Sequence, residues 1–178
     1  MDGLWVFIAA DMTMFGLFFS SFVVERSKNV ALFNRSQKAL NFNVGGINTL
    51  ILLTSSWFVV LAVDAARRNK LRQVPHFIAL AILCGAAFAV IKLTEYWHKL
   101  SSGISMLTND FYMFYFVLTG IHFLHVVAGV VVLSIVWTAA RRGAYGKDDC
   151  VGLESGATYW HMTDLLWIML FPLLYLMS

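Results

Sequence analysis

The sequence predicts an all-α fold, an integral membrane bundle of five transmembrane helices. Two observations lead to this fold class. Hydrophobic residues make up 60% of the 178 residues and charged residues only 13%, whereas about a quarter of the residues in an ordinary soluble domain are charged. The apolar residues are also gathered into long runs that short charged loops separate. Hydrocarbon offers no partner for backbone N–H and C=O groups, so such runs must satisfy them internally, as a helix does.

Each apolar run is close to the roughly 20 residues that cross a bilayer as a helix. The first run lacks a basic leader and a small-residue cleavage site, and it contains Asp11. We therefore expect it to be retained as a helix and not removed as a signal peptide. No repeat or flexible linker divides the chain, which predicts one membrane domain over residues 1–178. The five predicted helices are Leu4–Val24, Ile47–Val63, Phe77–Trp97, Phe111–Ala140 and Ala157–Met177.

The distribution of Lys and Arg predicts the orientation. Five crossings place seven of these residues on the side of the N-terminus and five on the other side. Two adjacent pairs, Arg67-Arg68 and Arg141-Arg142, stand at helix ends, where the positive-inside effect is strongest. We expect a cytoplasmic N-terminus and a periplasmic C-terminus in a bacterial inner membrane, and no nucleic-acid partner. The seven residues are Arg67, Arg68, Lys70, Arg72, Arg141, Arg142 and Lys147.

Acidic and histidine side chains inside the predicted spans are the first candidate site. At about 1.5 Å rise per residue, Asp11 and Asp164 both lie roughly 10 Å below the cytoplasmic start of their helices. His161 and Glu154 fall near the same helical face as Asp164. Ionisable groups in a membrane are costly and indicate function by default, so these four residues are candidates for a cytoplasm-facing proton antenna. Interhelical hydrogen bonding alone is the alternative, and one sequence does not decide between them.

A second set of residues is interpreted as contacts between helices or subunits. His122 and His125 lie three apart on one helix, which suggests haem or copper, but the depth of His161 does not match theirs well for pairing across a porphyrin. We expect neutral imidazoles that form hydrogen bonds between helices, and no cofactor or metal in this chain. Lys92 and Glu95 form an i, i+3 pair that a salt bridge or snorkelling to the interface explains. The contact candidates are Glu95, His122, His125, Trp160 and Trp167.

Several motifs in a fixed order resemble subunit III of the haem-copper oxidases over nearly the whole chain. The two most specific are a G-x-H-x-x-H-V stretch that begins at Gly120 and a Y-W-H-x-x-D-x-x-W stretch that begins at Tyr159. The resemblance is to a five-helix version of that family. The segments that carry it are Asp11–Phe15, Asn48–Ser55, Glu95–Tyr96, Thr119–Val126 and Glu154–Trp167.

Within that family the sequence looks most similar to the NorE branch, which is associated with nitric oxide reductase. Asp11 stands where many relatives have a glutamate, and Val63-Asp64 stands where a histidine pair often ends the next helix. The resemblance implies a non-catalytic subunit that binds lipid, supports assembly, stability and proton uptake, and serves haems and copper held in subunit I. Its implied partner is subunit I of an oxidase or the catalytic subunit of a nitric oxide reductase.

Two other function classes stay open from the residues. A haem-carrying electron-transfer protein would use His122 and His125 as ligands. An independent proton or ion transporter would depend on Asp11 or Asp164. Autonomous hydrolytic chemistry has no support, because no glycine-rich phosphate loop, nucleophile elbow or zinc motif is present in the sequence.

Overall fold

The computed structural model describes residues 2–145 and 150–177, and the elements in these ranges are six α-helices. Each predicted span falls almost entirely within one long helix, and the helices extend beyond most of the apolar runs. Their bounds are α1 Asp2–Lys28, α2 Val30–Lys38, α3 Phe42–Arg67, α4 Val74–Ser101, α5 Asp110–Arg141 and α6 Val151–Tyr175. The all-α prediction is confirmed for the described ranges.

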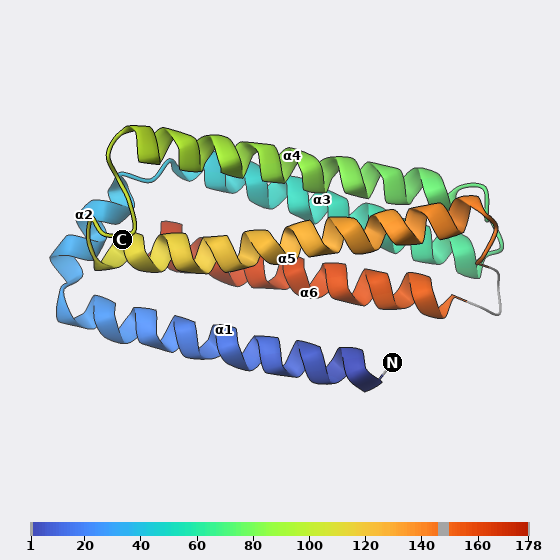
Figure 1. The fold of residues 1–178 in the computed structure, drawn as a ribbon, viewed down its shortest axis with the longest axis horizontal. Helices are drawn as coiled ribbons and strands as arrows, with labels where there is room; N and C mark the ends of the chain where they lie inside the picture. The colour runs from blue at the N-terminus through green and yellow to red at the C-terminus, as the bar shows by residue number, and fades with distance from the viewer. Residues whose placement is uncertain (1, 146–149, 178) are drawn as a thin grey trace.

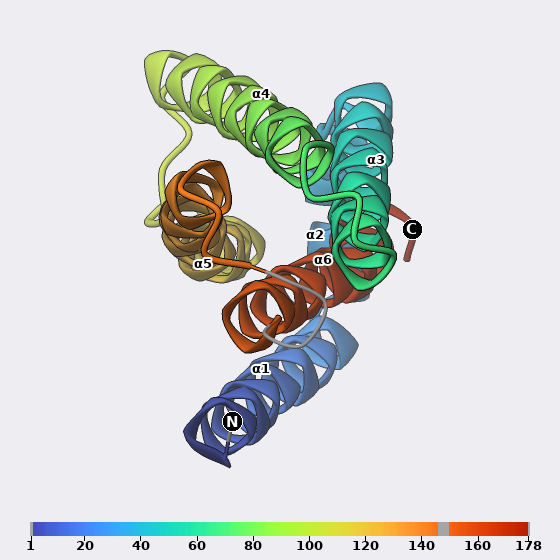
Figure 2. The same cartoon turned by 90° about the vertical axis from the view of Figure 1, so that its right-hand side faces the viewer.

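The long helices lie side by side, as Figure 1 shows, with α1 on the outside. Seen along the bundle in Figure 2, α1 packs beside α6 and away from α4. The start of α1, the α3–α4 connection, the end of α5 and the start of α6 lie together at what we call the first end (Figure 1). The helix α2, the α4–α5 connection and the end of α6 lie at the second end. Lys147, counted among the basic residues of the first end, is outside the described residues.

The helix α2 was not predicted, because residues 25–46 were interpreted as a loop. It has only nine residues and a polar composition, so no apolar window of membrane length marks it. The side-chain oxygen of Asn29 caps it by accepting from the N–H of Leu32 at 3.4 Å. The ring of Phe33 in α2 is buried, and it packs edge-on against Phe22 of α1 and Phe111 of α5. The helix therefore ties α1 to the bundle at the second end.

Four helices, α1, α3, α4 and α5, are long and apolar enough to cross a membrane by length and composition. The fifth predicted span lies in α6, which has 25 residues but also carries His161, Thr163 and Asp164. Thr163 and Asp164 are buried, so these two polar residues, which lower the hydropathy of α6, face protein. A crossing by α6 stays a prediction.

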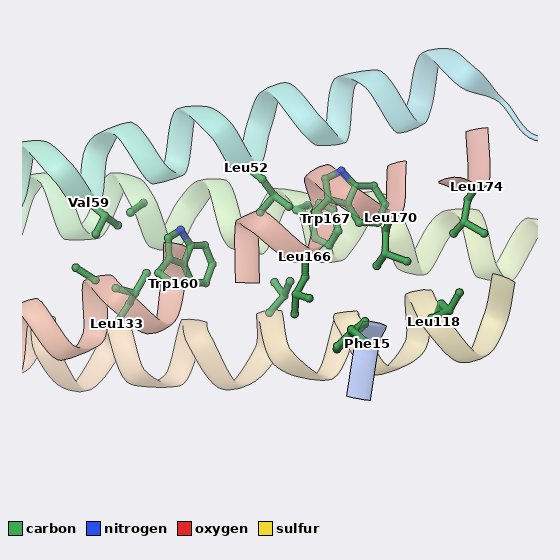
Figure 3. Packing of buried hydrophobic residues seen from close by; sticks show 14 of the residues in the cluster. Phe15, Leu52, Val59, Leu118, Leu133, Trp160, Leu166, Trp167, Leu170 and Leu174 are labelled. Atoms are coloured by element: carbon green, nitrogen blue, oxygen red, sulfur yellow. The ribbon is translucent and has the colours of Figure 1, made fainter. Parts of the chain in front are cut away.

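The helix α6 lies at the centre of the packing. Figure 3 shows its side chains Trp160, Leu166, Trp167 and Leu170 among residues of α3 and α5. The indole of Trp160 is fully buried between two glycines, Gly85 of α4 and Gly129 of α5. A Cβ atom at either glycine would lie 2.8 or 2.7 Å from the ring. The absence of a side chain at both positions is what gives the ring its space.

Candidate functional site

A buried acid and a histidine meet between α1 and α5. Asp11 is 7% exposed and lies on the same face of α1 as the buried Phe15 and Phe22. Its Oδ1 atom is 3.1 Å from Nε2 of His125. The other ring nitrogen of His125, Nδ1, is 2.8 Å from the carbonyl oxygen of Ile121. The second carboxyl oxygen of Asp11 makes no hydrogen bond with the described residues.

This geometry fixes how many protons the pair holds. A carbonyl oxygen only accepts, so Nδ1 of His125 carries a hydrogen and donates it to Ile121. The short contact between Nε2 and the carboxyl oxygen then needs one more hydrogen between them, because two bare lone pairs repel. That hydrogen belongs either to an imidazolium facing a carboxylate or to a carboxylic acid facing a neutral ring. The contact therefore has room for one hydrogen between the ring nitrogen and the carboxyl oxygen.

A hollow of about 410 Å³ opens at the first end between α3 and α6. An ion pair at its rim joins Glu154 to Arg67, with Oε1 and Nη2 2.8 Å apart. His161 lines the inner part, and its Nδ1 lies 2.6 Å from Oγ of Ser56. Its lining residues are Val60, Val63, Asp64, Arg67, Glu154, Ala157, Thr158 and His161.

Asp164 is one helical turn beyond His161 and is only 3% exposed. It lies beside Ser56, but neither of its carboxyl oxygens makes a hydrogen bond with the residues that the structure describes. An unpaired buried carboxylate is costly. A proton or a water molecule would supply the partner that its carboxyl oxygens lack.

The four predicted antenna residues thus divide into two places. Glu154, His161 and Asp164 follow α6 inward from the first end, facing α3. Asp11 instead contacts His125, and no hydrogen bond among the described residues joins it to His161 or Asp164. Equal depths were predicted for Asp11 and Asp164, but the partner of Asp11 depends on the rotation of α1 about its own axis.

The contact candidates lie in the core. His122 is fully buried edge-on to Phe88 and near Trp167, with ring centroids 5.8 and 5.1 Å away. Neither of its ring nitrogens makes a hydrogen bond with the described residues, so the expected interhelical bond from this ring is not seen. Trp167 donates from Nε1 to Oγ1 of Thr49 at 2.9 Å. His122 and His125 face different neighbours and do not converge on one site.

Lys92 and Glu95 belong to a larger buried charge cluster with Tyr115 and Tyr175. Nζ of Lys92 donates to Oε2 of Glu95 at 2.9 Å and to the two tyrosine oxygens at 3.1 and 3.3 Å. Both tyrosines donate to Oε1 of Glu95, at 2.6 and 3.1 Å. The side chain of Lys92 is 1% exposed, so the prediction that it snorkels to the interface is wrong. The alternative prediction, a salt bridge with Glu95, is confirmed.

Sequence reasoning missed the tyrosines of this cluster because they are far from Lys92 along the chain. A usable signal was present, since a tyrosine inside an apolar span needs a partner for its hydroxyl group. Tyr115 and Tyr175 are such residues, and Tyr96 is another, its hydroxyl 2.6 Å from Oγ1 of Thr119. The pairing itself depends on how α4, α5 and α6 are rotated.

Comparison with known proteins matches residues 2–178 to the model of the family described as cytochrome c oxidase subunit III. The chain belongs to that family. It is 32% identical to cytochrome c oxidase subunit 3 of Synechocystis sp., covering 99% of this chain and 75% of the relative. It is also 32% identical to cytochrome c oxidase subunit 3 of Thermostichus vulcanus, covering 99% and 86%.

A further relative is quinol oxidase subunit 3 of Bacillus subtilis, 27% identical over 99% of this chain and 86% of the relative. The names of these subunit III proteins therefore include two electron donors, cytochrome c and quinol. The described residues of this subunit III chain contain no group of three His, Cys, Asp or Glu side chains able to hold a metal ion. Its ionisable groups are instead arranged as pairs and clusters within the helix bundle.

Proposed function

We propose that this chain is a non-catalytic accessory subunit of a respiratory haem-copper oxidoreductase in the inner membrane of a bacterium. It supports the assembly and stability of the complex, binds lipid and assists proton uptake, while the haems and copper belong to the partner catalytic subunit. Membership of the subunit III family supports the partnership. The observation that carries the proton role is the buried contact between Asp11 and His125, which has room for one hydrogen between the ring nitrogen and the carboxyl oxygen.

The placement of groups at the first end supports a second step of proton collection. The ion pair of Glu154 and Arg67 stands at the mouth of the hollow, His161 lies further in, and Asp164 lies beyond it. A histidine can accept a proton on one nitrogen and release one from the other. His161 would pass protons from the hollow towards Ser56 and Asp164, for delivery to the neighbouring catalytic subunit.

The finer assignment is to the NorE branch, with the catalytic subunit of a nitric oxide reductase as the partner. Its support is the aspartate at position 11 and the Val63-Asp64 pair at the end of α3, where Asp64 binds Arg68 at 2.9 Å. The identity of the co-purifying catalytic subunit tests it. A subunit I that reduces oxygen would remove this assignment and leave the accessory role in place.

The test begins with purification of the tagged full-length chain from native membranes in mild detergent. We expect a haem-containing catalytic subunit to co-purify, identified by mass spectrometry, and no Soret absorption from the chain once it is separated. A Soret band that stays with the isolated chain and is lost when His122 and His125 are both replaced would favour the electron-transfer protein. Proton flux in liposomes by the chain alone would favour a transporter.

The Asp11→Asn variant separates a proton role from packing. An asparagine amide can donate to Nε2 of His125 and so keep the contact, but it cannot release that proton. We expect turnover of the purified complex to slow several-fold, or inactivation to quicken, with unchanged haem content, and the same for Asp164→Asn. Asp110→Asn, an exposed residue at the second end, is the control. Wild-type turnover by Asp11→Asn would reduce the pair to a packing contact, as would failure of the complex to assemble.

A further inference from the structure

A second hollow, of about 390 Å³, lies at the second end, away from the residues considered for proton uptake. It is formed by the connection between α2 and α3 on one side and by the last turns of α4 on the other. Alanine, valine and isoleucine side chains make part of its wall, and polar groups occupy the rest. The lining residues are Ala39, Asn41, Val44, Ile91, Thr94, Glu95, His98 and Lys99.

Lys99 is the unusual member of this lining. It is two residues from the end of α4, where a lysine ordinarily extends into water, yet it is only 9% exposed. Its Nζ atom lies over the rings of Tyr115 and Tyr112, 5.2 and 5.9 Å from their centroids. No hydrogen-bond acceptor or carboxylate of the described residues reaches it. Aromatic faces attract a cation but leave its three N–H donors without acceptors.

The charges around the hollow do not cancel. Glu95 is the one carboxylate in the lining, and it attracts Lys99 electrostatically. It already accepts hydrogen bonds from Lys92, Tyr115 and Tyr175. The charges of Lys92 and Glu95 offset each other within the buried charge cluster. One positive charge, on Lys99, is therefore left beside the hollow on a side chain that is only 9% exposed, a state that an anion would stabilise.

We infer that this hollow binds a singly charged phosphate group through Lys99. Asn41 adds a donor, because its side-chain oxygen accepts from the N–H of Asn43 while its NH₂ group makes no hydrogen bond with the described residues. The group could be the phosphodiester of an anionic phospholipid or free phosphate. The apolar side chains of Val44 and Ile91 favour the phospholipid, because they offer a surface for the start of an acyl chain.

This site gives a location to the lipid binding included in the proposed function. It is tested on the isolated full-length chain, so a failure here would leave the partnership with a catalytic subunit untouched. The probes are dioleoylphosphatidylglycerol, which is anionic, dioleoylphosphatidylcholine, which is zwitterionic, and inorganic phosphate. Binding to the delipidated chain in non-ionic detergent is measured by native mass spectrometry.

We expect phosphatidylglycerol to bind more tightly than phosphatidylcholine and Lys99→Gln to weaken its binding about tenfold, the effect of losing one charge-assisted hydrogen bond. Lys28→Gln, at an exposed lysine of the same end paired with Glu25, should bind as the wild type does. Lys99→Arg should retain binding because it keeps the charge. Inorganic phosphate is tested in the same way. If it displaces the lipid, and if its ³¹P signal broadens only when Lys99 is present, the site is supported with free phosphate as its ligand.

Equal binding of phosphatidylglycerol by the wild type and Lys99→Gln would overturn the inference. Should Lys99→Gln fail to fold, as judged by circular dichroism, Ala39→Trp supplies the decision. Ala39 is exposed on the rim, so a tryptophan there fills the hollow without disturbing the core. If Ala39→Trp loses lipid binding, the site is supported. If Ala39→Trp binds the lipid as the wild type does, the inference is overturned.

Discussion

At the scale of single residues, the buried charge of Lys92 restricts which side chains can surround it in the half of the bundle nearest the second end. It is surrounded by the aromatic rings of Tyr96, Tyr115, Trp167 and Tyr175, with Nζ between 5.0 and 5.9 Å from their centroids. A cation held in this way depends on Glu95, its one carboxylate partner among the described residues, because the tyrosines supply only neutral dipoles. Removing that partner leaves the charge uncompensated, whereas removing both members can be nearly neutral.

We therefore predict that Glu95→Gln lowers the free energy of unfolding by about 3–5 kcal/mol, measured by denaturant titration in detergent. The double variant Lys92→Met/Glu95→Gln should recover much of that loss. A matched control exists at the surface, where Lys28 and Glu25 form a pair with the same i, i+3 spacing. Glu25→Gln should cost less than about 1 kcal/mol. Additive effects of the two core substitutions would refute the coupling.

At the scale of elements, α6 organises the bundle because it contacts α1, α3 and α5 and sends Trp160 and Trp167 towards α4. The fit around Trp160 is set by backbone positions on α4 and α5. Ala81 adds to the close approach of α3 and α4, since its carbonyl oxygen accepts from Oγ of Ser55 at 2.9 Å. Gly85 and Gly129 are therefore needed to make room for the indole ring of Trp160.

Gly129→Ala tests that fit. The added methyl group would lie 2.7 Å from Cε3 of Trp160, and overpacking of this kind costs about 1–3 kcal/mol. We expect a lower midpoint of thermal unfolding in detergent, followed by circular dichroism. Gly120→Ala, on the same helix with nothing within 4 Å of the added carbon, should be neutral or slightly stabilising. Trp160→Phe combined with Gly129→Ala should restore part of the midpoint, and no restoration would show that another contact is responsible.

At the scale of the whole molecule, the long helices run between the two ends, and the described termini lie at opposite ends (Figure 1). The long helices are α1, α3, α4, α5 and α6. We propose that all five cross the membrane, α6 included, since 25 residues of helix span roughly 37 Å. The arginines at the ends of α3 and α5 favour the first end as the cytoplasmic one.

Reporter fusions check this orientation. Alkaline phosphatase joined after residue 178 should be active in the periplasm, and the same enzyme joined after Asn69 should be inactive. Green fluorescent protein at the two positions should give the reverse pattern. Activity at both positions, or at Asn69 alone, would contradict the assignment and require a different number of crossings or the opposite orientation.

The sequence by itself determined the all-α class, the places of the long helices and the family, because hydrophobic run length and motif order are properties of neighbouring residues. It also singled out Asp11 and Asp164 as candidates for a proton site, and His125 as a candidate contact between helices or subunits. It did not find α2, since a short polar helix gains its stability from packing Phe33 against other elements.

Only the tertiary structure decided which polar groups meet. Asp11 could face any neighbour of α1 until the rotation of the helix placed it against His125. Lys92 was interpreted as able to reach the interface, but the tyrosines that enclose it come from helices 23 and 83 residues further along the chain. Such contacts depend on how helices rotate and cross, and that is set by the summed packing of the whole bundle around Trp160 and its glycines.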